Sequence, residues 1–86
     1  MWQLDIILHI INWPGVEKLN QILTERETEI FNLLVKSYTT AEIAQKLNIS
    51  TKTARNHISN VIGKLGVKSR TQAIIMLIKS GLIKLD

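Results

Sequence analysis

Residues 39–65, TTAEIAQKLNISTKTARNHISNVIGKL, contain two helix starts separated by a short turn. Thr39 and Glu42 have the spacing of a capping box, in which each side chain accepts a hydrogen bond from the other residue's backbone N–H. Asn48, Ile49 and Ser50 follow as a tight turn, and Ser50 is a favourable N-cap for the next helix. The stretch therefore predicts a short helix, a turn of three residues and a longer helix.

The longer predicted helix, residues 51–65, has one apolar and one polar face. The apolar positions recur at helical spacing and predict burial: Ala54, Ile58, Val61 and Leu65. The opposite face holds polar or cationic residues and no acid: Lys52, Arg55, Asn56 and Ser59. A short helix followed by such a helix is typical of a helix-turn-helix, whose second helix enters the major groove of DNA. The alternative is a solvated outer face on a small helical bundle.

Three residues of the polar face have side chains that suit base recognition. Arg55 can present two donors to guanine, and Asn56 can exchange two hydrogen bonds with adenine. Ser59 can hydrogen-bond almost any base. We therefore expect Arg55, Asn56 and Ser59 to read base edges.

The two ends of this helix carry groups that suit DNA phosphate. At the first turn, hydroxyls, backbone amides and the helix dipole all favour an anion. The residues of that turn are Thr51, Lys52 and Thr53. The cations that flank the far end, where they could hold the backbone of a second strand, are Lys64, Lys68 and Arg70.

Two further cap patterns extend the helical prediction to most of the chain. Thr24 and Glu27 form a second capping box, ahead of a helix that should end near residues 36–37. Ser69 is the N-cap of a last helix, which Gly81 ends. The sequence thus predicts an all-α domain of four helices over residues 23–86, preceded by an apolar N-terminal segment, residues 1–22.

The N-terminal segment is strongly apolar over residues 1–13. It is shorter than the roughly 20 apolar residues that a membrane span requires, and it lacks basic residues, so we expect no membrane association. Apolar residues at helical spacing favour a helix, although a strand is the alternative. Such a helix would pair with its copy in a second chain, dock a partner protein or pack on its own domain.

Composition excludes several classes of function. The 86 residues suffice for one domain, and 45% of them are hydrophobic. The chain has no cysteine, and His9 and His57 are its only histidines, so we expect neither a thiolate site nor a histidine-based metal site. It also lacks a glycine-rich phosphate loop. We therefore expect no metal, no cofactor and no enzymatic activity.

The distribution of charge indicates an anionic partner. The formal net charge is +4, and the stretch from Ile43 to Leu85 contains eight Lys or Arg residues and no acidic residue. Such an uncompensated basic stretch suggests nucleic acid or a membrane surface. The alternative is a solvated basic surface that binds nothing.

Residues 23–85 resemble the LuxR/GerE-type DNA-binding domain of bacterial transcription regulators. The resemblance is carried, in order, by LTERETEIFNLLV (23–35), TTAEIAQKLNIS (39–50), TKTARNHISNVIGKLGVKSRTQAI (51–74) and GLIKL (81–85). It covers most of the chain, and the overall size is similar to that of a stand-alone regulator of this family. The chain departs from the family at Ala54, where valine is usual, and at Gly63, within the helix. Arg55 and Asn56 also replace the usual Lys-Val pair, so no target sequence can be transferred.

The resemblance implies a four-helix domain that binds DNA as a dimer, with the last helix pairing across the two-fold axis. It places base reading on Arg55, Asn56 and Ser59. It implies phosphate contacts at Thr53, Lys64 and Lys68, together with Ser50 and Lys52. The implied dimer positions are Thr71, Ile74, Ile75 and Ile78.

The residues of the last helix support this dimer independently. Ala73 and Leu77 suffice to face the core, which leaves an exposed isoleucine patch that a monomer would rarely tolerate. The alternative is that Ile74 and Ile78 complete the core of their own domain.

We interpret the chain as a sequence-specific transcription regulator that binds double-stranded DNA as a homodimer on inverted-repeat promoter sites. Its expected location is the bacterial cytoplasm, at the nucleoid. The alternative is an interaction module or a sigma-like accessory factor. In that case the apolar N-terminus docks RNA polymerase or a second regulator, and DNA binding is secondary.

Overall fold

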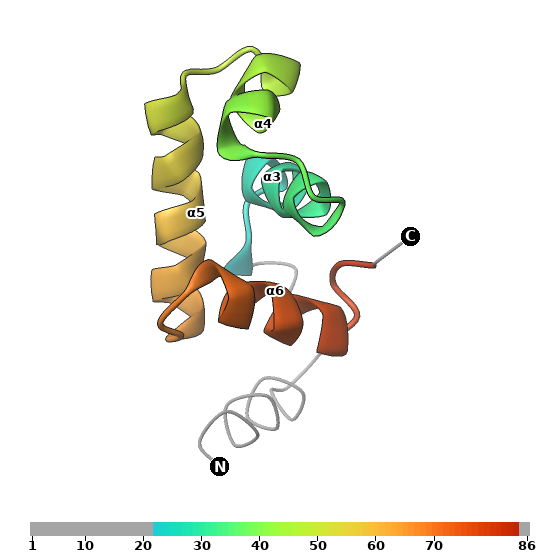
Figure 1. Ribbon diagram of the computed structural model, residues 1–86. Coiled ribbons are helices and arrows are strands. Elements are labelled where there is room, and N and C mark those ends of the chain that lie inside the picture. Colours follow the sequence, from blue (N-terminus) through green and yellow to red (C-terminus); the bar gives the residue numbers. More distant parts are fainter. Residues whose placement is uncertain (1–21, 85–86) are drawn as a thin grey trace.

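The computed structural model describes residues 22–84 (Figure 1). This part of the chain contains four helices and no strand: α3 (Glu25–Val35), α4 (Thr40–Leu47), α5 (Thr51–Leu65) and α6 (Arg70–Lys79). The predicted all-α domain is thus confirmed. The helix or strand expected in residues 1–13 lies outside the described residues.

Each of the four helices begins at a hydroxyl side chain that accepts a hydrogen bond from a backbone N–H three residues later. The caps are Thr24, Thr39, Ser50 and Ser69. In α3 and α4 the capping box is complete, because Glu27 and Glu42 accept from the backbone N–H of the cap at 2.9 and 2.8 Å. The helix starts predicted from the sequence are therefore confirmed.

Each of these helices ends in a Schellman motif, in which a residue with left-handed backbone reverses the chain. The apolar residue that follows donates its N–H to the carbonyl five positions earlier, as Tyr38 does to Leu33 at 3.2 Å. The left-handed residues are Ser37, Asn48, Gly66 and Gly81, with φ of 72°, 56°, 69° and 84°. Glycine and asparagine tolerate this conformation, whereas serine at position 37 does so only with strain.

We expect Ser37→Gly to stabilise the domain, because glycine adopts left-handed backbone without the steric penalty of a Cβ atom. The greater entropy of glycine in the unfolded chain offsets part of the gain. The free energy of unfolding in urea should rise by about 0.5–1 kcal/mol. Gly66→Ala, at φ 69°, is the matched control and should lower it by a similar amount. A Ser37→Gly chain no more stable than the parent would contradict this account.

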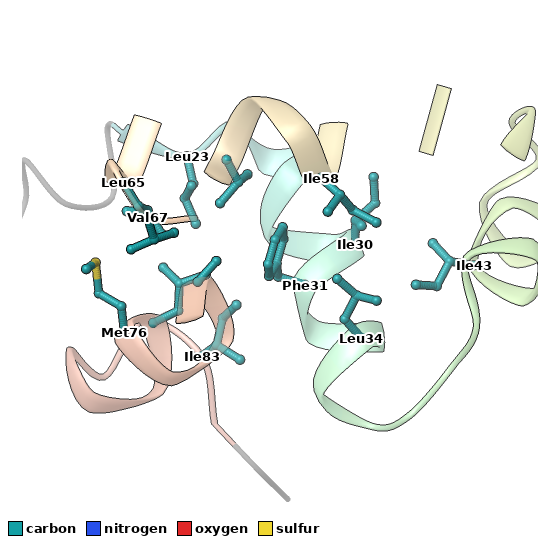
Figure 2. Close-up of a cluster of buried hydrophobic side chains, with 13 residues drawn as sticks. Leu23, Ile30, Phe31, Leu34, Ile43, Ile58, Leu65, Val67, Met76 and Ile83 are labelled. Atoms are coloured by element: carbon teal, nitrogen blue, oxygen red, sulfur yellow. The ribbon is translucent and has the colours of Figure 1, made fainter. Parts of the chain in front are cut away.

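The core lies where α5 packs against the other three helices (Figure 1). Figure 2 shows Phe31 near the middle of the cluster, with Ile30 and Leu34 on one side and Met76 and Ile83 on the other. The four residues of the predicted apolar stripe of α5 are all buried: Ala54, Ile58, Val61 and Leu65. Because this stripe is fixed in the core, the opposite face of α5 is held outward.

Candidate nucleic-acid interface

Helix α5 lies along one edge of the molecule, with α4 preceding it across the turn of residues 48–50 (Figure 1). The predicted outward residues are all exposed: Lys52, Arg55, Asn56 and Ser59. The structure therefore brings the three predicted base-reading side chains onto one free surface. It also exposes Asn60, which the sequence analysis missed. The available signal was its position one helical turn after Asn56.

Hydroxyl groups at the start of α5 form an ordered pair. Ser50 Oγ accepts from the backbone N–H of Thr53 at 3.0 Å and donates to Thr53 Oγ1 at 2.8 Å. Since the hydrogen of the Ser50 hydroxyl is taken, the Thr53 hydroxyl keeps its own hydrogen for a further acceptor. Thr53 and Lys52 are exposed and Thr51 is half-buried. With no acid in the first turn, this helix end can receive an anion.

Of the two cations after α5, Lys68 lies in the connection to α6 and Arg70 is the first residue of α6. The Lys68 side chain is exposed, while its backbone N–H donates to Gln72 Oε1 at 2.8 Å. Arg70 is also exposed, and its Nη1 donates to Thr40 Oγ1 at 3.3 Å. This bond links the first turn of α6 to the first turn of α4. The other donors of the guanidinium remain for an external acceptor.

Lys64 differs from the other predicted phosphate residues, because its charge is already paired with a carboxylate inside the fold. Lys64 Nζ lies 2.7 Å from Glu27 Oε1 and 3.0 Å from the carbonyl oxygen of Ile22. Burial by itself raises the pKa of the Glu27 carboxyl. The hydrogen bonds from Lys64 and Thr24, with the Lys64 charge, outweigh burial and hold the pKa below its ordinary value of 4.5.

The lowered pKa of Glu27 predicts how stability depends on pH. A carboxyl whose pKa is lower in the folded chain stabilises it above the unfolded pKa, and this contribution disappears as pH falls through the folded pKa. Glu27→Gln, which keeps the capping acceptor, should lower the free energy of unfolding by about 1–2 kcal/mol at pH 7. Urea unfolding from pH 7 to pH 3 should show the difference from the parent shrinking in acid. A difference independent of pH would contradict a charged Glu27.

His57 lies at the boundary between the two faces of α5. It is half-buried, and its Nδ1 is buried without a hydrogen-bond partner in the described part of the chain. Only Nε2 of this ring could therefore contact a DNA phosphate, and the structure shows no role of this kind for His57.

The predicted dimer residues lie on α6 outside its buried stripe, two of them exposed and two at the edge of the core. The buried residues of this helix are Ala73, Met76 and Leu77. Ala73 and Leu77 face the core as predicted, but the prediction that these two suffice is wrong, because Met76 is buried as well. Ile75 is 37% exposed, and Thr71 is also exposed. Ile74 and Ile78 are half-buried at the edge of the core. These two isoleucines thus contribute to the core while keeping part of their apolar surface free.

Residues 22–84 contain neither a metal-binding group of side chains nor a helix that could span a membrane. They bring no three His, Cys, Asp or Glu side chains within reach of one metal ion. None of their helices has the length and apolarity that a membrane crossing needs.

The buried stripe and the exposed cationic face of α5, set after a short helix and turn, define a helix-turn-helix domain of the kind found in transcription regulators. Residues 21–77 match the family described as bacterial regulatory proteins, luxR family. Because this match spans more than half of the chain, the chain belongs to the luxR family of bacterial regulatory proteins. The resemblance noted in the sequence is thereby confirmed.

Individual relatives agree with this assignment. The spore germination protein GerE of Bacillus subtilis is 56% identical over 64 residues, which cover 74% of this chain and 86% of GerE. The response regulator protein VraR of Staphylococcus aureus is 45% identical over 67 residues, which cover 78% of this chain and 32% of VraR. The chain thus spans about a third of the length of VraR.

A solved structure gives the same result. The structure of the transcription factor GerE matches with a TM-score of 0.74 at 57% identity, covering 76% of this chain and 97% of that one. The relatives are transcription regulators and not enzymes, which agrees with the expectation from composition that the chain has no enzymatic activity. The chain is a DNA-binding transcription regulator of the GerE type.

Proposed function

We propose that the chain binds double-stranded DNA sequence-specifically as a homodimer at inverted-repeat promoter sites, in the bacterial cytoplasm at the nucleoid. One observation carries this proposal: α5 buries its whole apolar stripe and presents Lys52, Arg55 and Asn56 on the opposite, acid-free face. A helix presented in this way can lie in the major groove, which admits one α-helix and displays a distinct pattern for each base pair.

In this proposal base reading falls on Arg55, Asn56 and Ser59. Arg55 pairs with guanine O6 and N7, and Asn56 pairs with adenine N6 and N7. Ser59 lies one helical turn after Arg55, and its hydroxyl can form a hydrogen bond with any of several bases. The exposure of all three side chains supports these roles.

Phosphate contacts surround the reading residues. At the start of α5 they come from Ser50, Thr51, Lys52 and Thr53, where unpaired backbone N–H groups and the Thr53 hydroxyl meet an anion. Beyond α5 they come from Lys68 and Arg70, both exposed. Lys64 was predicted with them from the sequence, but its bonds to Glu27 and Ile22 support a role inside the domain instead.

The homodimer forms through α6. Helical counting at about 100° per residue places Thr71, Ile74, Ile75 and Ile78 within an arc of roughly 100°, opposite the buried stripe. Their free apolar surface suits a two-fold interface, in which the same patch serves both subunits. Two reading helices related in this way meet half-sites about one helical turn apart.

Selection of bound duplexes from a random DNA pool at near-physiological salt tests the proposal. We expect enrichment of an inverted repeat whose half-site centres lie about 10 bp apart. Binding that enriches no sequence and fades steeply as salt rises would contradict sequence-specific recognition.

A second function is proposed for the apolar residues 1–13, whose composition suits docking of RNA polymerase or a second regulator. Deleting these residues should then abolish capture of RNA polymerase or the second regulator while leaving DNA binding intact. Loss of dimerisation after the deletion would instead assign residues 1–13 to contact between two copies of the chain.

A further inference from the structure

Lys64 stands apart among the cations that follow residue 42. Within residues 22–84, it is the one cation of this stretch that forms an ion pair with a carboxylate, at 2.7 Å from Glu27 Oε1. A second acceptor, the carbonyl oxygen of Ile22, lies 3.0 Å from the same nitrogen. Two of the three ammonium donors are therefore used inside the domain.

Glu27 needs this cation, because its carboxylate is almost entirely out of solvent. The Glu27 side chain is 3% exposed, whereas the Lys64 side chain is 36% exposed. Oxygen Oε1 of Glu27 also accepts from the backbone N–H of Thr24 at 2.9 Å, so one atom serves the α3 cap and the ion pair together. A buried charge is strongly unfavourable unless it is paired, and removing Lys64 would leave Glu27 unpaired.

The position of Lys64 on α5 agrees with an internal role. The outermost line of the helix runs through Lys52, Asn56, Ser59 and Gly63, which lie at i, i+4, i+7 and i+11. Helical counting places Lys64 about 100° from Gly63, on the flank that meets the start of α3. The ammonium group thus ties the last turn of α5 to residues 22–27, where the N-terminal segment joins the domain.

We infer that Lys64 is a positioning residue and not a phosphate ligand. Its charge is neutralised by Glu27, and its ammonium group fixes the last turn of α5 to residues 22–27. This inference rests on the proposed DNA binding. Each cation that neutralises a phosphate releases counterions and adds about 0.9 to the slope of log K against log salt. A cation already neutralised inside the fold adds nothing to this slope.

The experiment compares Lys64→Met with Lys68→Met in the full chain, using one selected duplex across a salt series. Lys68→Met should reduce the slope by about 0.9 per half-site and leave the urea midpoint unchanged. Lys64→Met should leave the slope unchanged and lower the urea midpoint. A slope reduced by about 0.9 per half-site in Lys64→Met, as in Lys68→Met, would overturn the inference and make Lys64 a phosphate ligand.

Glu27→Gln keeps the test decisive if Lys64→Met does not fold, because glutamine retains the capping acceptor. Loss of the carboxylate removes the ion pair, but Lys64 stays on the flank of α5 that meets the start of α3, so the slope should remain unchanged while the urea midpoint falls. A slope steeper by about 0.9 per half-site, with tighter binding at low salt, would place the freed Lys64 charge on a phosphate and overturn the inference. If the parent binds no duplex in a salt-dependent way, the proposed function fails instead. The positioning role of Lys64 is then tested by the urea midpoints alone. This role is supported only if Glu27→Gln lowers the urea midpoint and Lys68→Met does not.

Discussion

A chain carrying both Arg55→Ala and Asn56→Ala is expected to lose most of its sequence preference while keeping its fold. Both side chains are exposed, so their removal leaves the core of α5 unchanged. Each bidentate contact to a base is worth about 1–3 kcal/mol of discrimination. Loss of two such contacts should therefore reduce the ratio of specific to nonspecific affinity by roughly 30-fold or more in each half-site.

Competition between the selected duplex and a scrambled one measures this ratio. Arg55→Ala alone should relax selection at a guanine, and Asn56→Ala alone should relax it at an adenine. Lys52→Ala is the control from the same face, since loss of a phosphate contact weakens both duplexes alike and reduces the salt slope by about 0.9 per half-site. Unchanged preference in the double variant would show that another element reads the DNA.

Local interactions explain why so much of this fold is predictable from the sequence. The caps at Thr24, Thr39, Ser50 and Ser69 bond backbone groups three residues away, so the pattern that forms them lies within four consecutive residues. The two faces of α5 are set by its own periodicity. Once the apolar stripe is buried, the exposure of Arg55, Asn56 and Ser59 follows without knowledge of any other helix.

Contacts between distant residues explain what the sequence did not reveal. Glu27 and Lys64 are 37 residues apart, and each has a sufficient local interpretation, as a cap and as a surface cation. Only the packing of α3 against α5 brings their charges together. The half-burial of Ile74 and Ile78 likewise depends on the neighbours of α6. The periodicity of α6 could not decide between core and interface, because both need apolar residues.

Ile75→Glu is expected to convert the proposed dimer into monomers and to weaken binding to the full inverted repeat. Ile75 is 37% exposed, so its own domain tolerates a polar replacement better than it would at the half-buried Ile74 or Ile78. In a two-fold interface, however, two glutamates would be buried beside each other without a partner, which strongly disfavours association. Joining two binding modules raises affinity by about 10²–10⁴, so affinity for the full site should fall by a comparable factor.

Sedimentation equilibrium and binding to two duplexes separate loss of the dimer from damage to the reading surface. Ile75→Leu, which keeps the apolar volume, should remain dimeric and bind the inverted repeat like the parent. Ile75→Glu should sediment as a monomer and bind a duplex holding one half-site as well as the parent does, because α5 is unchanged. A monomeric Ile75→Glu chain that binds the full site with parental affinity would show that α6 pairing is not used on DNA. A variant that remains dimeric would place the interface elsewhere in the chain.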